Sequence, residues 1–205
     1  MTRNASNKNI LVTGPNGVGK SELIKYLLAG WPGVFRHVSS SMILMECMGV
    51  KTHPELAQFS DEIKHAAFDA RASCMMNENK DASSPSHLLI DTHLLYFDAG
   101  EVKSSFMPYV QKADGIVAVY ADQDQLLQRI QQDAERGVRE RSILPPDIND
   151  PRLAAATLAG YVTMNRIFAD MVGHEFNIPV IHIDNSGSLE LTARQFIEKL
   201  LPDLL

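Results

Sequence analysis

Residues 14–21 of this 205-residue chain have the sequence Gly-Pro-Asn-Gly-Val-Gly-Lys-Ser, which constrains the fold more than any other stretch. The stretch fits the spacing G-x-x-x-x-G-K-[ST] at every fixed position. Glycines let successive backbone N–H groups turn toward an anion, and a helix that begins there points its positive end at the same place. An apolar run precedes the stretch and an apolar-periodic segment follows it. The sequence therefore predicts a phosphate-binding loop between a strand and a helix.

The loop assigns roles to two side chains. Lys20 is expected to bring a point charge to the outer phosphates, and Ser21 to offer an oxygen ligand to Mg²⁺. A nucleoside triphosphate such as ATP, with Mg²⁺ as cofactor, is the ligand that suits this chemistry. The predicted nucleotide-binding residues of the loop are Gly14, Pro15, Asn16, Gly17, Val18, Gly19, Lys20 and Ser21.

The rest of the chain alternates short apolar runs with longer helical patterns. We expect strands at 10–13, 34–39, 88–91, 116–120 and 180–183. Strands that alternate with helices predict a parallel sheet covered on both faces. The sequence therefore predicts an α/β protein with three layers and a five-stranded parallel sheet, formed by residues 1–205 as a single domain.

Two helix starts have a chemical signature. Asp122 is expected to cap the helix that follows it, with Gln125 as its capping-box partner. Asp150 followed by a proline predicts another N-cap, for a helix that runs to about residue 172.

The region between the second and third expected strands is mostly helical in pattern. Residues 54–79 are expected to form one or two helices, with Ser60 as an internal cap. The polar stretch 77–86 is expected to be a surface loop.

Composition limits the cellular location and the classes of binding partner that we expect. The formal net charge is −6 at pH 7, which argues against binding nucleic acid or an anionic membrane. No apolar run approaches the length of a membrane span, and the first nine residues are polar. The two cysteines, Cys47 and Cys74, form no metal-ligand spacing. We therefore expect a cytoplasmic protein without nucleic-acid or membrane partners.

Three classes of protein bind nucleotides with such a loop. A switch GTPase needs a guanine-binding Asn-Lys-x-Asp sequence, which this chain lacks, and the D-x-x-G stretch at 184–187 follows the last expected strand, too late to hold a γ-phosphate switch. A large ATPase module needs more residues than remain. A kinase for a small molecule is the class that the sequence favours.

A kinase must neutralise the charge that accumulates on the transferred phosphoryl group. The segment 136–150 contains Arg136, Arg139, Arg141 and two adjacent prolines, so it cannot be helical throughout. We interpret it as a lid that closes over the phosphates. The alternative is a solvated charged loop.

Two residues at the end of the third expected strand are further candidates. Asp91 ends an apolar run where a parallel strand delivers its last residue to the crevice beside the phosphate loop, and it could hold Mg²⁺ directly or through water. The alternative is an aspartate that caps a turn. His93 could donate to an acceptor phosphate or to a loop carbonyl.

These features together resemble the archaeal-type adenylate kinases. The similar segments are "HVSSSMILM", "LLIDTH" followed by "MPYV", "LLQRIQQDAERGVRER" and "MNRIFADMVGHEFNIPVIHIDNSGS", in that order, and they span nearly the whole chain from residue 10 onward. The resemblance implies a P-loop kinase fold with a short lid, and the reaction of ATP with AMP to give two ADP in the presence of Mg²⁺.

The resemblance also implies a role for each matching residue. Residues 37–80 would hold the acceptor, with Ser40 and Ser41 at the acceptor nucleotide. Asp91 and His93 would lie near the transferring phosphate, and the three arginines of the lid would act on it together with Lys20. The residues that would border the ATP base are Asn185, Ser186 and Gly187.

The chain departs from the bacterial branch of these kinases. That branch has an arginine where this chain has Met45, and Asp-Gly-Phe-Pro-Arg where this chain has residues 91–93, Asp-Thr-His. There is also no room for a long zinc lid. Two other functions therefore stay open: a P-loop kinase for another acceptor, and an ATP-hydrolysing assembly or regulatory factor on the same fold.

Overall fold

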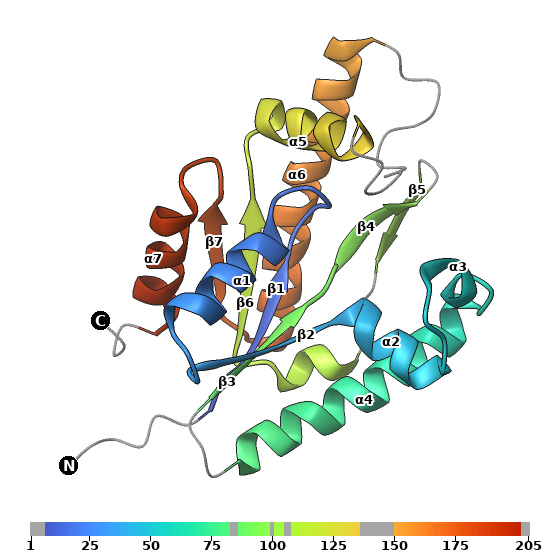
Figure 1. Ribbon diagram of the computed structural model, residues 1–205, viewed down its shortest axis with the longest axis vertical. Coiled ribbons are helices and arrows are strands. Elements are labelled where there is room, and N and C mark those ends of the chain that lie inside the picture. The colour runs from blue at the N-terminus through green and yellow to red at the C-terminus, as the bar shows by residue number, and fades with distance from the viewer. Residues whose placement is uncertain (1–6, 83–85, 99–100, 105–107, 136–149, 202–205) are drawn as a thin grey trace.

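The computed structural model describes residues 7–82, 86–98, 101–104, 108–135 and 150–201. At its centre lies a five-stranded parallel sheet in the order β2-β3-β1-β6-β7 (Figure 1). Its strands are β1 (Asn9–Thr13), β2 (Phe35–Ser39), β3 (His87–Asp91), β6 (Gly115–Tyr120) and β7 (Val180–Asp184). Each lies at an apolar run of the sequence, and each end differs from the predicted one by at most one residue. The predicted fold class is confirmed.

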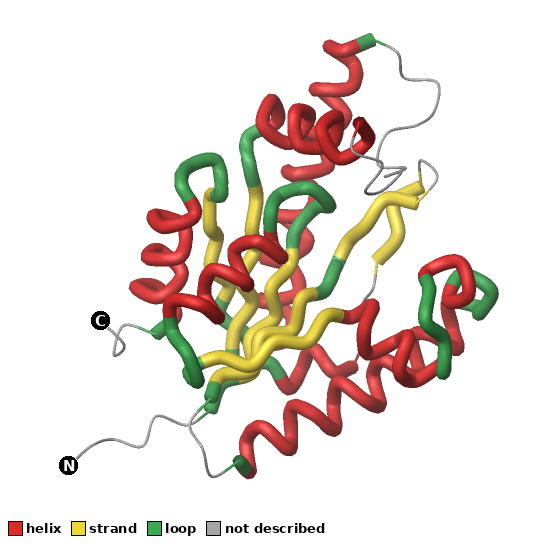
Figure 2. The backbone as a smooth tube through the Cα atoms, in the orientation of Figure 1, coloured by secondary structure: helices red, strands yellow, loops and turns green. Residues whose placement is uncertain are grey.

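Helices cover both faces of this sheet (Figure 2). The helices of one layer are α1 (Lys20–Gly30) and α7 (Leu189–Leu200), and the principal helices of the other are α4 (Asp61–Asp81) and α6 (Pro151–Phe176). The three-layer arrangement follows from parallel strands, because each connection between them must cross a face of the sheet.

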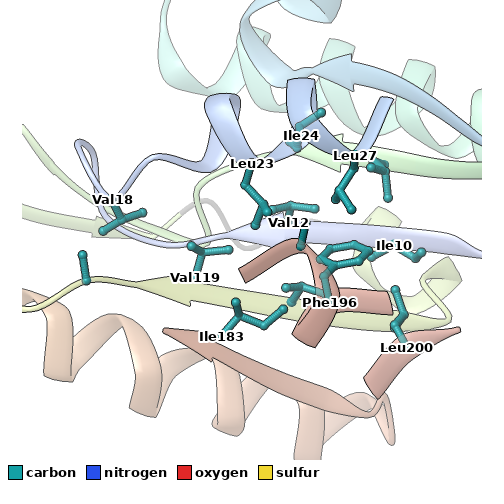
Figure 3. Packing of buried hydrophobic residues seen from close by; sticks show 14 of the residues in the cluster. Ile10, Val12, Val18, Leu23, Ile24, Leu27, Val119, Ile183, Phe196 and Leu200 are labelled. Atoms are coloured by element: carbon teal, nitrogen blue, oxygen red, sulfur yellow. The ribbon is translucent and has the colours of Figure 1, made fainter. Parts of the chain in front are cut away.

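Alternate residues of each strand point to opposite layers. Ile10 and Val12 pack with Leu23, Leu27 and Phe196 of α1 and α7 (Figure 3). Leu11, between them, packs instead into the second cluster, which contains residues of α4 and α6. Every residue of β1 is buried, so both faces of the central strand contribute to the core. Each large apolar side chain buried in this way stabilises the fold by about 1.5–3 kcal/mol.

The remaining elements lie at the margins of the sheet. They are α2 (Ser40–Met48), α3 (His53–Leu56), the short 3₁₀ helix η1 (Pro108–Lys112), α5 (Gln123–Glu135) and an antiparallel hairpin of β4 (Leu95–Asp98) and β5 (Glu101–Ser104). No sequence pattern considered above predicts the hairpin, because its strands have only four residues each and little periodicity.

The predicted helix caps are mostly confirmed. The Ser60 hydroxyl accepts a hydrogen bond from the Ile63 N–H at the start of α4, and the Asp150 carboxylate accepts one from the Arg152 N–H at 2.8 Å. Helix α6 continues to Phe176, four residues beyond the predicted end.

Asp122 caps α5 as predicted, since its carboxylate accepts hydrogen bonds from the N–H groups of Asp124 and Gln125. The capping-box prediction for Gln125 was wrong. Its side-chain amide donates to the Ser186 carbonyl at 2.6 Å, and the Asp122 N–H donates instead to the Ser186 hydroxyl at 2.8 Å. Ser186, from the loop after β7, therefore binds the Asp122 N–H in place of Gln125.

The prediction of a polar loop at 77–86 was wrong for its first half, because α4 continues to Asp81. Asn79 is fully buried there, and its side chain donates to the Asn9 side chain and the Lys8 carbonyl and accepts from Arg36. The polar residue is buried because the starts of two strands supply its partners. A pattern of polar letters does not distinguish such a residue from one in a surface loop.

The predicted lid, 136–150, falls almost entirely on residues 136–149, which lie outside the described residues, as do Arg136, Arg139 and Arg141. The described chain ends α5 at Glu135 and resumes at Asp150. The single-domain division and the boundaries 37–80 and 136–150 stay predictions. Within the described residues, no helix is both long enough and apolar enough to span a membrane.

Candidate active site

The glycine-rich loop lies between the end of β1 and the start of α1, as predicted. Gly14, Gly17 and Gly19 have φ angles of 144°, 86° and 87°, which residues with a Cβ rarely adopt. At Gly14 a Cβ would also clash with the carbonyl oxygen of Val119 on β6. The close approach of loop and sheet therefore requires glycine at this position.

Lys20 is buried within the loop, with 6% of its surface exposed. Its ammonium group donates hydrogen bonds to the carbonyls of Gly14 at 2.9 Å and Pro15 at 3.2 Å. The charge thus lies against the first residues of the loop, at the end of α1 where backbone N–H groups have no partner within the helix. Its contact with the outer phosphates stays a prediction.

Other side chains fix the loop carbonyls from outside. A ring nitrogen of His93 donates to the Gly14 carbonyl at 3.0 Å. The Val18 carbonyl accepts from the Arg129 guanidinium at 3.0 Å and from the Asn185 amide at 2.7 Å. These bonds satisfy the carbonyls of Gly14 and Val18 and fix their positions, while the N–H groups of the loop stay suited to an anion.

His93 therefore adopts the second of its two predicted roles with Nδ1, that of a partner for a loop carbonyl. Arg129 on α5 was not predicted. Its guanidinium also donates to the Asn185 carbonyl at 3.0 Å and to Gln125, so it joins α5, the phosphate loop and the loop after β7. Because these partners are 111 and 56 residues away in sequence, no local pattern could have identified it.

Asp91 ends β3 beside the first turn of α1. The Ser21 hydroxyl donates to the Asp91 carboxylate at 3.3 Å, so the two predicted metal ligands are adjacent. The register of the sheet explains their proximity, because Asp91 pairs with Val12 of β1, shortly before the loop begins.

Thr92 anchors the segment that carries Asp91. Its N–H donates to the Val12 carbonyl at 3.0 Å, and its hydroxyl lies 3.2 Å from the Tyr109 hydroxyl. Tyr109 is fully buried, and burial raises its pKa to about 12, so it stays protonated and able to donate. Asp91 and His93 are thus positioned by a buried residue between them.

The Ser21 and Asp91 oxygens fit the needs of Mg²⁺. Both are hard oxygen donors, and their separation is close to that of neighbouring ligands in an octahedron with bonds of about 2.1 Å. Among the described residues, no three His, Cys, Asp or Glu side chains cluster in a metal-binding arrangement. Mg²⁺ held here would therefore take its other ligands from water and phosphate, which is its usual preference.

A cavity of about 990 Å³ opens over the loop and extends to α2 and α3. In the described part of the chain it is larger than the cavity beside Tyr120 and Arg166, and it unites residues from seven helices and strands and from three loops. Its walls are Asn16, Gly17, Gly19, Lys20, Ser21, Glu22, His37, Ser39, Ser40, Ser41, His53, Asp91, His93, Arg129, Asn185 and Leu189.

Most of the predicted site residues that are described line this cavity, including Lys20, Asp91 and the pair Ser40 and Ser41. Ser186 is placed differently, since it accepts hydrogen bonds from the first residues of α5. The predicted residues that do not line the cavity are Gly14, Pro15, Val18, Ser186 and Gly187.

Three cavity residues at the acceptor end were not predicted: His37, Ser39 and His53. Ser39 caps α2, because its hydroxyl accepts from the Met42 N–H at 3.2 Å. His37 and Ser39 occupy alternate positions of β2 and so point to the same face. That alternation is visible in the sequence and could have identified both.

His37 has the clearest electrostatic perturbation in the cavity. Burial lowers its pKa, and the nearby carboxylate of Asp91 opposes this shift. Its Nε2 is buried without a hydrogen-bond partner among the described residues. The imidazole is therefore neutral at pH 7 and can accept a hydrogen bond.

Asn165 and Arg166 of α6 serve the scaffold. The Asn165 amide donates to the Tyr161 carbonyl within the helix. The Arg166 guanidinium stacks over the Tyr120 ring, 4.5 Å from its centre. Asp170, four residues after Arg166 on the same helix, contacts His182 at 2.7 Å.

A family model described as an AAA domain matches residues 13–144, well over half of the chain. The chain belongs to this AAA-domain family. The match begins at the last residue of β1 and includes the phosphate loop, Asp91 and α5. A comparison with curated protein sequences gives no match.

Solved structures similar to this AAA-domain chain include two shikimate kinases. Shikimate kinase from Acinetobacter baumannii, in complex with shikimate, aligns with a TM-score of 0.54 and 16% identity over 97% of this chain and 96% of that one. Shikimate kinase from Bacteroides thetaiotaomicron aligns with a TM-score of 0.59 and 13% identity over 94% and 98%. A protein from Thermus thermophilus aligns with a TM-score of 0.54 and 19% identity over 98% and 99%.

At these identities the similarity establishes the fold alone. The sequence resemblance is thus confirmed at the level of the P-loop kinase fold. Membership of the archaeal-type adenylate kinase branch stays a prediction.

Proposed function

We propose that this protein transfers the γ-phosphoryl group of ATP to a small-molecule acceptor. One observation carries the proposal: a single cavity extends from the phosphate loop to a second wall of serines and histidines, with Ser21 and Asp91 between them. A protein that only hydrolyses ATP has no need of the second wall. A phosphotransferase needs two substrates side by side.

The donor half holds ATP. Backbone N–H groups of residues 14–21 bind its phosphates, and Lys20 adds charge at the outer ones. Mg²⁺ on Ser21 and Asp91 would neutralise charge on the β- and γ-phosphate oxygens. Residues 185–187 border the base, and Arg129 keeps that loop aligned with the phosphate loop.

The lid arginines complete the site in this proposal. Arg136, Arg139 and Arg141 come after α5 in the sequence and lie outside the described residues. Their guanidinium groups would stabilise the charge that develops on the transferred group, which is worth more where water is excluded.

AMP is the acceptor that the sequence resemblance implies, with Ser40 and Ser41 at the acceptor nucleotide. A second candidate is an acceptor that offers a hydroxyl group. The acceptor wall favours it, because the described residues there are hydroxyls, imidazoles and a carboxylate, without an arginine to bind a phosphate or an apolar slot for a base. One structural neighbour binds shikimate, which carries hydroxyl groups.

A coupled assay of ADP formation tests the proposal. Purified protein with Mg²⁺ and ATP is offered AMP, other nucleoside monophosphates, shikimate and simple polyols. We expect acceptor-dependent ADP formation with at least one of them. ATP hydrolysis that no acceptor accelerates would contradict the proposal and favour an ATP-hydrolysing assembly or regulatory factor instead, a function that the AAA-domain match also accommodates.

A further inference from the structure

His37 differs from His87, His93 and His182 in its lack of hydrogen bonds, and its Nε2 is buried without a partner among the described residues. His87 accepts the Lys8 N–H at 3.1 Å, His93 donates to the Gly14 carbonyl, and His182 contacts Asp170. No hydrogen bond joins the His37 ring to any described residue, and its Nε2 is buried. Such an unpaired buried group costs about 1–3 kcal/mol unless something else supplies the bond.

The position of His37 indicates which group supplies the missing hydrogen bond. His37 and Ser39 lie on the same face of β2, and Ser39 pairs in register with Asp91 of β3. The ring lines the same cavity as Asp91 and the serines that begin α2. This cavity also contains the phosphate loop, so a bound acceptor can supply the missing hydrogen bond.

The other charged and titratable groups that line this cavity come from several elements. They are Lys20 and Glu22 from α1, Asp91 and His93 from β3 and the loop after it, His53 from α3 and Arg129 from α5. Lys20 and Arg129 donate to loop carbonyls, and the charge that acts on His37 is the carboxylate of Asp91.

We propose that His37 accepts the hydrogen bond, and then the proton, of a hydroxyl group on the acceptor, so that the acceptor class is an alcohol. The inference rests on the proposed phosphotransferase function and names its substrate class. A hydroxyl group needs a proton acceptor when it is phosphorylated, whereas a phosphate monoester is already an anion at neutral pH. A neutral imidazole without a protein partner suits the phosphorylation of a hydroxyl group.

The step balances as follows. The acceptor oxygen forms a bond to the γ-phosphorus as its O–H bond breaks, and the proton passes to the unprotonated ring nitrogen of His37. The bond from the γ-phosphorus to the β,γ-bridging oxygen breaks, and ADP leaves with the electron pair. His37 then returns the proton to solvent. The products are a phosphate monoester of the alcohol and ADP.

The test combines product identification with two variants of His37. Shikimate, D-gluconate, glycerol and AMP are incubated with Mg²⁺ and ATP, and ³¹P NMR identifies each product as an ester or an anhydride. We expect an ester from at least one alcohol. For that alcohol, His37→Ala is expected to lower kcat about 10²- to 10³-fold, and added imidazole to restore part of the loss.

His37→Gln separates positioning from proton transfer, because glutamine can accept a hydrogen bond but cannot take up the proton. The glutamine variant is expected to have a KM for the acceptor within about threefold of the wild-type value. Its kcat should fall as far as that of the alanine variant. The matched control is His174→Ala, at an exposed position of α6, which should keep the wild-type kcat and show no response to imidazole. Circular dichroism and binding of a fluorescent ATP analogue verify the fold of each variant.

The outcomes are distinct. Transfer to AMP alone, with an anhydride product, overturns this inference and leaves the proposed function intact. A wild-type kcat in both His37 variants also overturns it alone, as does a loss that imidazole does not restore. Absence of transfer to every compound, AMP included, overturns the proposed function and this inference together.

Discussion

The two ends of the central sheet differ in whether their buried polar groups have hydrogen-bond partners. At the amino ends of the strands, buried asparagines form a network in which side chains and backbone groups bond to one another. At the carboxyl ends, the loop carbonyls are held in place, but His37 Nε2 and Asn185 Oδ1 remain buried and unpaired among the described residues. The first end is arranged for stability, and the second retains hydrogen-bonding capacity that a ligand can use.

The network at the amino ends centres on Asn79. Its side chain bonds to Asn9, Arg36 and the Lys8 carbonyl, and its own carbonyl accepts from Asn7. The network thereby ties α4 to the first residues of β1 and β2. A buried network of this kind is favourable only when its members are satisfied, because the low local dielectric strengthens both made and missing bonds.

Replacement of Lys20 by methionine is expected to have the largest effect and to fall on the carboxyl end alone. The charge for the phosphates is lost while the loop keeps its length and packing, so kcat/KM should fall about 10²- to 10³-fold. Initial rates of ADP formation and thermal unfolding measure the two properties. Lys25→Met, at an exposed position of the same helix, is the control and should leave both unchanged. A similar loss in the control would remove the special role of Lys20.

Replacement of Asn79 by alanine is expected to lower stability and to leave the activity of the folded protein unchanged. It leaves Arg36, Asn9 and the Lys8 carbonyl without their partner in a buried site, so we expect a loss of about 2–4 kcal/mol in the free energy of unfolding. Activity per folded molecule should be retained. Urea titrations of this variant and of Asn77→Ala, an exposed neighbour on α4, provide the measurement. Equal stability of the two variants would show that the network contributes nothing.

Two glycines of α6 sharpen the comparison further. A Cβ at Gly173 would clash with the Val180 side chain and lie 2.8 Å from the Ile178 carbonyl, so Gly173→Ala should destabilise the packing at the amino end of β7 by about 1–3 kcal/mol. Gly160 has open space around it, and Gly160→Ala should stabilise the helix by about 0.5–1 kcal/mol. Thermal unfolding should shift in opposite directions, and shifts of the same sign would contradict the packing described here.

The smallest expected effect is the pH dependence of stability. Burial, and next the charge of Lys8, lower the pKa of His87, while Asp114 opposes the shift and Lys80 adds to it. The unfolded state therefore binds the proton more tightly. Neutral His87 therefore contributes to the free energy of unfolding. This contribution is complete above the pKa of the unfolded state, about 6.5, and is lost as the pH falls through the lower pKa of the folded state.

Urea unfolding at a series of pH values from 7.5 to 5 measures this contribution. The free energy of unfolding should fall with pH in the wild type and fall less in His87→Gln. A slope remains in the variant, because burial lowers the pKa of His37 as well. An unchanged slope in His87→Gln would exclude the contribution of His87.

Local sequence patterns predicted much of the scaffold. Apolar runs located all strands of the main sheet, and the caps at Ser60, Asp122 and Asp150 were confirmed. These predictions succeeded because a buried strand and a capped helix depend on residues within a few positions of each other. Asn79 and Gln125 were misjudged because their partners come from distant segments.

The candidate site divides along the same line. The phosphate loop is a single stretch, and its spacing alone predicted Lys20 and Ser21. The proximity of Ser21 to Asp91 was expected from the rule that parallel strands deliver their last residues to one edge. Arg129 entered the site only through the fold, because its partners are far away in sequence, whereas the alternation along β2 could have identified His37.

The sequence by itself determined that a glycine-rich turn joins a strand to a helix, because the glycine spacing and the flanking apolar periods are local properties. It also determined the parallel sheet, because alternating strands and helices admit few other arrangements. Only the tertiary structure decided which polar groups were paired and which stayed unpaired. Hydrogen bonds between residues 43, 56 and 167 positions apart depend on a spatial arrangement that no neighbouring residue encodes.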